Sequence, residues 1–120
     1  MTNKFEMFVG VRSLPAQKLL KKYSASRGAF ITAHNPFGCV VLPEENIIQT
    51  KRLILNIKSC GCVSFDGIGA SINGDWSEQS FFVIDPSDVM LNSIFTKYNQ
   101  DAFVLIKNNS AVELILNTYI

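Results

Sequence analysis

The one histidine of the chain, His34, lies in the segment FITAHNPFG (residues 30–38), where an apolar run meets polar and rigid residues. Histidine exchanges a proton near neutral pH. A carboxylate such as Glu78 or Glu45 can act as a base if burial raises its pKa. His34 and Glu78 together would therefore suit the acid/base pair of an enzyme that acts on a small molecule.

The polar residues of four short segments also suit a binding site without catalysis. They supply hydrogen-bond donors and acceptors and one aromatic wall, which fit a small polar ligand. The expected ligand-binding residues are Thr32, His34, Asn35, Asn46, Trp76, Glu78 and Gln100. A third interpretation is purely structural: the two asparagines bond to loop backbone, Trp76 fills the core and Gln100 caps a turn. The sequence favours a binding or assembly module, which would use an apolar sheet face or the Phe37–Val41 loop and could hold a polar small-ligand pocket near the Thr32–Pro36 turn. The small-molecule enzyme is the alternative, and no catalytic residue is identified.

Signatures of metals and cofactors are missing from the sequence. Cys60-Gly-Cys62 is too closely spaced for a zinc knuckle and has no second pair. Cys39 lies near His34, but the sequence places no acid partner beside them. The phosphate loop, the H-E-x-x-H helix and the G-x-S-x-G elbow are absent. We therefore expect reduced thiols, no metal and no cofactor.

Charge and composition restrict the partners. The net charge of +1 and the small basic clusters at 18–22 and 51–52 do not predict nucleic-acid binding. No stretch has the roughly 18 apolar residues of a membrane span, and no signal segment follows the first residues, so we expect a cytoplasmic protein that does not bind membranes. A hydrophobic content of 48% with only 18% charged residues favours a homodimer.

Apolar periodicity and turn residues divide the 120 residues into strands and helices of one α+β domain, residues 1–120. Ser13 and Pro15 begin the first helix and Pro43 begins a longer one, which Gly61 ends. The glycine-rich stretch Gly67–Ser77 is expected to be a loop. The expected strands are 5–11, 29–33, 62–66, 80–84, 102–106 and 112–116, and the expected helices are 13–23, 43–59 and 85–98.

The order of these elements predicts the architecture. From the strand at 29–33 to the strand at 102–106 the order is β-α-β-β-α-β, that of a ferredoxin-like unit. An extra N-terminal β-α and a C-terminal strand flank that unit. Three of its strands are apolar without alternation, so both faces of the sheet must be covered. Two helices would cover one face, and the first helix or a second subunit would cover the other.

Four patterns in the chain together resemble a known family. They are Thr32-Ala33-His34-Asn35-Pro36, Glu44-Glu45-Asn46, Gly74-Asp75-Trp76 before Glu78 and Ser80, and Asn99-Gln100-Asp101-Ala102. In this order they resemble the bacterial family called domain of unknown function 3293, over roughly residues 5–116. The chain has His34 where that family often has tryptophan, and Asp101 where it often has asparagine. The family has no established activity, so the resemblance implies no particular reaction. Whether the four patterns meet at one end of the sheet is left open.

Overall fold

The computed structural model describes residues 6–7, 12–33, 41–70, 77–100 and 102–116. It is an α+β structure with three helices and a sheet of six strands. The elements follow the expected order: β1 (Glu6–Met7), α1 (Leu14–Lys22), β2 (Arg27–Ile31), α2 (Pro43–Ser59), β3 (Ser64–Ala70), β4 (Ser77–Ile84), α3 (Asp88–Lys97), β5 (Ala102–Lys107) and β6 (Glu113–Leu116).

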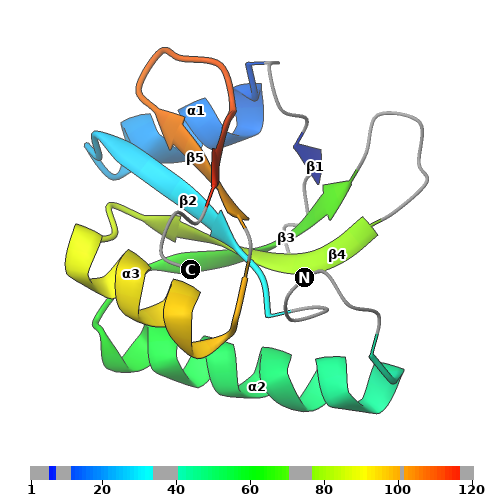
Figure 1. Ribbon diagram of the computed structural model, residues 1–120. Coiled ribbons are helices and arrows are strands. Elements are labelled where there is room, and N and C mark those ends of the chain that lie inside the picture. Colours follow the sequence, from blue (N-terminus) through cyan, green and yellow to red (C-terminus); the bar gives the residue numbers. More distant parts are fainter. Residues whose placement is uncertain (1–5, 8–11, 34–40, 71–76, 101, 117–120) are drawn as a thin grey trace.

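The strands lie in the order β1-β3-β4-β2-β5-β6 (Figure 1). Five of them form a continuous antiparallel sheet, and the short β1 pairs with β3 in parallel. The central strand β2 places Phe30 opposite Phe82 of β4 on one side and opposite Val104 of β5 on the other. The most apolar strands therefore lie in the middle of the sheet, where both of their faces can be buried.

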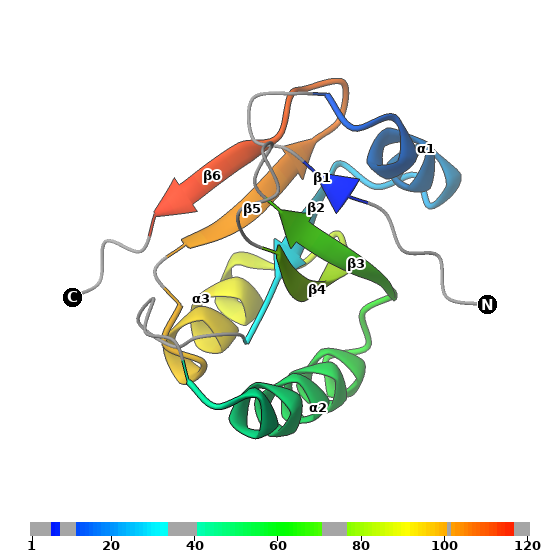
Figure 2. The ribbon, with the colours of Figure 1, turned by 90° about the vertical axis from the view of Figure 1, so that its right-hand side faces the viewer.

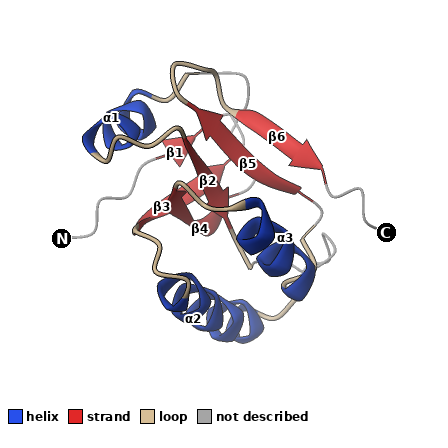
Figure 3. Cartoon of the chain, turned by 90° about the vertical axis from the view of Figure 1, so that its left-hand side faces the viewer, coloured by secondary structure: helices blue, strands red, loops and turns tan. Residues whose placement is uncertain are grey.

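Helices α2 and α3 cover one face of the sheet (Figures 2 and 3). Leu53 and Ile57 of α2 are fully buried, because they lie four residues apart on the same side of the helix. They belong to a core cluster with Ile94 of α3 and with alternate residues of the central strands, including Ile31 and Val83. This is the larger of two apolar clusters, and it holds the two long helices in place.

Helix α1 covers the opposite face (Figure 3). Its residues Ala16 and Leu20 are fully buried, and they pack in a second cluster with Phe30, Phe82 and Ile106 of the sheet. The prediction that both faces are covered is confirmed. The first helix provides that cover, as one of the two expected alternatives proposed.

The helix ends use the signals that the sequence contains. The Ser13 hydroxyl accepts a hydrogen bond from the Ala16 N–H at 3.3 Å and so caps α1. The Ser87 hydroxyl caps α3 in the same way, by accepting from the Met90 N–H at 3.1 Å. After α2 the chain turns at Gly61, whose φ of +74° is a left-handed conformation that glycine adopts without a steric penalty.

The expectation of a loop over Gly67–Ser77 was wrong at both of its ends. β3 continues to Ala70 and β4 begins at Ser77, so the two strands pair over a longer stretch than predicted. Gly67 lies opposite Ser80 and Gly69 lies opposite Glu78. Glycine has a low strand propensity, but pairing with the apolar β4 overrides that local preference. Glu78 is therefore inside a strand and does not precede one.

The described helices include none that has both the length and the apolar character needed to span a membrane.

Candidate functional site

The described parts of the four sequence patterns lie at one end of the sheet, which we call the motif end. It comprises Thr32 and Ala33 after β2, the first residues of β4, the first turns of α2, and residues 97–100 before β5. β2 runs toward this end, whereas the antiparallel β4 and β5 run away from it (Figure 1). The Thr32 hydroxyl donates a hydrogen bond to the Gln79 carbonyl at 2.9 Å, which ties the exit of β2 to the start of β4. Sheet pairing thus places the described strand residues of these patterns at one end of the sheet, whereas His34, Asn35, Trp76 and Asp101 lie outside the described residues.

Two of the expected site residues at the motif end have defined surroundings. Asn46 is half-buried in the first turns of α2. Gln100 is buried, and its side-chain amide donates to the Tyr98 carbonyl at 3.1 Å. The Gln100 N–H also donates to the Phe95 carbonyl at 3.2 Å. Gln100 therefore stabilises the turn that follows α3, in line with the structural interpretation of this residue.

A small hollow of about 60 Å³ lies at the motif end. It is lined by Ala33, Gln49, Lys97, Tyr98 and Asn99, which come from the segment after β2, from α2, and from the end of α3 and the residues that follow it. The lining combines one ammonium group, two side-chain amides and one aromatic ring. Such a space suits one small polar group or ordered water, because a water needs only about 10–15 Å³ of probe volume and some polar partners.

Tyr98 links the hollow to α2. Its hydroxyl accepts a hydrogen bond from the side-chain amide of Asn56, and the Lys97 ammonium lies 3.4 Å from the amide oxygen of Asn56. Burial raises the pKa of Tyr98 above its ordinary value, although the hydrogen bond from Asn56 and the nearby Arg52 act in the opposite direction. Tyr98 is therefore a neutral hydrogen-bonding group over the physiological pH range.

The remaining expected site residues cannot be placed against this hollow. His34, Asn35 and Trp76 lie outside the described residues, as does Cys39. The backbone of Glu78 lies in β4, but its side chain lies outside the described part of the chain. The acid/base pair of His34 and Glu78 remains a prediction. Within the described ranges, no three His, Cys, Asp or Glu side chains are grouped as metal ligands.

A much larger cleft, which we call the α1 cleft, lies at the other end of the sheet between α1 and the turn from β5 to β6. Its volume is about 710 Å³. Its described lining residues are Arg12, Leu14, Gln17, Lys18, Leu20, Lys21, Ser24, Ala25, Ser26, Asn108 and Asn109. Sequence analysis missed this site. It considered the lysines only as a basic cluster too small to predict nucleic-acid binding, and nothing local indicates that the helix lies beside a turn roughly 90 residues further along the chain.

Gln17 holds the two walls of the α1 cleft together. The side-chain nitrogen of Gln17 donates to the backbone carbonyls of Lys107 and Ser110 at 3.0 and 3.2 Å. Its side-chain oxygen accepts from the Asn109 N–H at 2.9 Å. The Arg12 guanidinium adds a hydrogen bond to the side-chain oxygen of Asn109 at 3.1 Å. The β5–β6 turn is thus fixed against α1, as Figure 1 shows.

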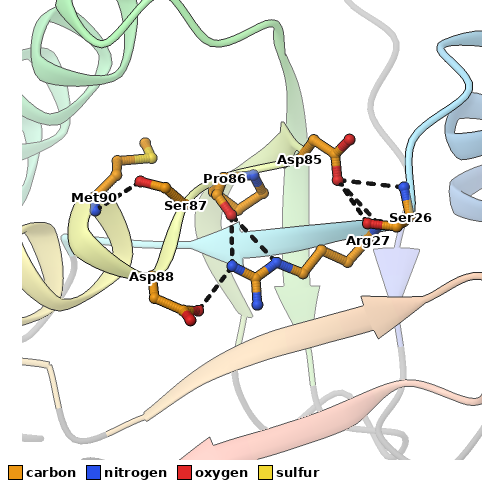
Figure 4. A network of polar contacts seen from close by, with 7 residues as sticks. All are labelled: Ser26, Arg27, Asp85, Pro86, Ser87, Asp88 and Met90. Carbon is orange, nitrogen blue, oxygen red and sulfur yellow. Dashed lines mark hydrogen bonds and ion pairs between the residues drawn. The ribbon is translucent and has the colours of Figure 1, made fainter.

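A polar network beside the α1 cleft joins β2 to the segment between β4 and α3 (Figure 4). The Asp85 carboxylate accepts from the Ser26 N–H, the Ser26 hydroxyl and the Arg27 N–H at 3.0–3.3 Å. The Arg27 guanidinium donates to the Pro86 carbonyl at 2.7 and 3.2 Å and pairs with Asp88 at 2.8 Å. This network sets the position of Ser26, one of the residues that line the cleft.

The two described cysteines differ in environment. Cys60 is exposed, whereas Cys62 is half-buried, and its thiol lies 3.8 Å from the sulfur of Met90. Burial, and to a lesser extent the neighbouring Cys60, raises the pKa of the Cys62 thiol.

We expect iodoacetamide to alkylate Cys60 several times faster than Cys62, because the thiolate is the reactive form. Peptide mass mapping of the folded protein over time checks this.

A raised folded-state pKa of the Cys62 thiol favours folding below the unfolded thiol pKa, about 8.5. This contribution is lost as the pH rises through the folded-state value, so Cys62→Ala should weaken the loss of stability as the pH rises above about 8.5. Equal alkylation rates of Cys60 and Cys62 in the native state would contradict the assignment.

One protein family matches the chain: the family described as "Protein of unknown function (DUF3293)" matches residues 31–103. No curated protein and no solved structure matches the chain. The matched span includes every described residue of the motif end. None of the described residues that line the α1 cleft falls within that span.

Proposed function

We propose that this chain, which belongs to the DUF3293 family because that family's model matches residues 31–103, is a binding module with a small-ligand site at its motif end. One observation carries this assignment: the family-matched span contains the residues that surround the 60 Å³ hollow, and segments far apart in sequence converge there. A function common to the family has to be built from the matched span. The larger α1 cleft lies outside that span and is a less suitable basis for it.

The lining of the hollow favours one chemical class of ligand. The Lys97 ammonium and the amides of Gln49 and Asn99 all offer N–H donors. Together they suit an oxygen-bearing group, namely a carboxylate or a carbonyl. The volume accepts one such group, so the rest of the ligand would lie outside the hollow.

The fold and cellular setting belong to the same proposal. The strand order β3-β4-β2-β5, with α2 and α3 as the two connections, supports a ferredoxin-like unit. The resemblance to the DUF3293 family supports a bacterial origin, and the cytoplasmic location stays a prediction from the sequence. Exposed apolar side chains on α2, including Ile48 and Leu55, support a homodimer, which the mass in solution would test.

A thermal-shift screen of small carboxylates and carbonyl compounds tests the motif-end site. We expect at least one compound to raise the melting temperature by several degrees, because a ligand at about 100 times its Kd stabilises the folded state by about 2.7 kcal/mol. Lys97→Gln and Gln49→Ala should abolish that shift. The matched control Asn92→Ala, on the exposed side of α3, should retain it.

Two outcomes would contradict the motif-end site: no shift across the library, or a shift that survives both Lys97→Gln and Gln49→Ala. The enzymatic alternative needs a further result. With a compound that binds, loss of its turnover in His34→Ala or Glu78→Gln, while its thermal shift is retained, would establish the acid/base pair.

A further inference from the structure

We propose that the α1 cleft binds a small molecule that carries a phosphate ester, at a site separate from the motif end. The cleft volume of about 710 Å³ lies within the range of small-molecule pockets, about 300–1,000 Å³. Its lining includes the buried apolar residues Leu20 and Ala25 and the exposed Leu14, together with polar and basic residues. This combination suits a ligand with an apolar or aromatic body and a charged end.

The charge of the lining indicates an anion. Arg12, Lys18 and Lys21 line the cleft, and none of its described lining residues is acidic. Among all described residues the one ion pair joins Arg27 to Asp88, so the three cations of the cleft are not neutralised by a described partner. The Asp85 carboxylate reaches one lining residue, Ser26, where it is already occupied as an acceptor of three hydrogen bonds.

Among anions, the arrangement of the hydrogen-bond donors in the cleft favours phosphate. The hydrogen bond from Arg12 to Asn109 orients the guanidinium and uses one of its five N–H donors. The remaining donors can form the paired contacts that arginine makes with phosphate oxygens. Ser24, Lys18 and Lys21 add donors from α1 and from its end.

The carboxyl end of α1 does not oppose an anion strongly. A helix normally presents unpaired carbonyl oxygens and partial negative charge at this end. Here the carbonyls of Leu19, Leu20 and Lys21 each accept an N–H from residues 23–25 at 2.8–3.1 Å. The last turn also carries Lys21 and Lys22, which offset the partial charge.

The cleft is organised before any ligand arrives. Ser24 and Asn109 line it from opposite walls in left-handed conformations, with φ of 51° and 61°. Such conformations are uncommon in residues other than glycine, although asparagine tolerates them, and constraints from the surroundings stabilise them. Gln17 supplies that constraint for the β5–β6 turn through its three hydrogen bonds. A site already fixed loses less conformational entropy on binding.

A small ligand fits better than a nucleic acid. Polyanions are bound by extended basic surfaces, and this chain has a net charge of only +1. The three cations lie around one concave site. They therefore suit one phosphate group rather than a repeating backbone.

Isothermal titration at low salt tests this site with AMP, adenosine, inorganic phosphate and citrate. We expect AMP to bind most tightly, inorganic phosphate more weakly, and adenosine and citrate least. The double variant Lys18→Gln/Lys21→Gln should lose at least about tenfold in affinity for AMP. The matched control Lys51→Gln/Lys58→Gln removes the same charge from exposed positions of α2 and should bind AMP as the unmodified chain does.

Several results would overturn the assignment. No binding of AMP or phosphate would exclude the site, and equal binding of citrate would exclude selectivity for phosphate. An equal loss of AMP affinity in the Lys51→Gln/Lys58→Gln control would show that the effect comes from the net charge of the protein. Loss of AMP binding in Lys97→Gln would place the ligand at the motif end. Tighter binding of single-stranded RNA than of AMP would identify a nucleic-acid surface instead.

Discussion

Replacing Gly28 with alanine is expected to lower the free energy of unfolding by about 3 kcal/mol, at the upper end of the usual cost of overpacking a core. A Cβ atom at this position would lie 2.3 and 2.5 Å from ring carbons of Phe82, and 3.2 Å from the Val83 carbonyl oxygen. The Phe82 ring has no room to move, because it is fully buried and packs against Phe30 with ring centres 5.4 Å apart. The Val83 carbonyl belongs to the paired strand β4 and is equally constrained.

Thermal and urea unfolding of Gly28→Ala measure this effect, and a decrease of roughly 10 °C in melting temperature is expected. Gly61→Ala is the matched control, since a Cβ there meets nothing within 4 Å and only the φ of +74° resists it. We expect that control to lose about 1 kcal/mol. Adding Phe82→Leu to Gly28→Ala should recover part of the loss. A Gly28→Ala protein as stable as the unmodified chain would contradict the close packing of β2 against this ring.

Asp85→Ala is expected to destabilise the fold by about 2 kcal/mol, because it removes an acceptor of charge-assisted hydrogen bonds and places alanine in an unfavourable conformation. The carboxylate accepts three hydrogen bonds from Ser26 and Arg27. The residue has a φ of 48°, a conformation that aspartate and asparagine tolerate better than alanine does. Because Asp85 is exposed, the expected loss in free energy of unfolding is smaller than the sum for three such hydrogen bonds.

Two companion variants separate the causes in the Asp85 network. Asp85→Asn keeps an acceptor oxygen and the tolerance for this conformation, so it should lose less than half as much stability as Asp85→Ala. Asp88→Ala removes the ion pair with Arg27 and the acidic residue in the first turn of α3. Because Asp88 is 82% exposed, a loss of at most about 1 kcal/mol is expected. Urea unfolding of the three variants is the measurement. An equal loss for Asp88→Ala and Asp85→Ala would show that the carboxylate of Asp85 has no special role.

Local signals in the sequence were sufficient for α1 and α2, whereas α3 begins at Asp88 and not at the expected residue 85. Pro43 and Gly61 bracket α2, and its observed bounds are those predicted. Ser13 caps α1 as expected. The need for cover on both faces followed from the unbroken apolar strands, and the structure meets it with helices on the two sides. These features depend on residues close together in the chain or on composition alone.

Features that depend on distant residues could not be predicted. The strand character of Gly67–Ala70 comes from pairing with β4 and overrides the low strand propensity of glycine. Predicting which pattern residues meet at the motif end required the register of the sheet, which depends on residues far apart in the sequence. The α1 cleft required Gln17 to reach the β5–β6 turn, and no local pattern marks such a contact. Asp85 appeared to begin a helix, whereas its carboxylate binds the start of β2.

The unequal size of the two apolar clusters has a consequence for local unfolding. On one face, two helices share a large cluster with the sheet, whereas on the other α1 is held by Ala16, Leu20 and the bonds of Gln17. Amide protons of α1 should therefore exchange with solvent through a partial opening that leaves α2 and α3 intact. A molecule bound against α1 would slow that exchange, so occupancy at this face would also decide how cooperatively the whole domain unfolds.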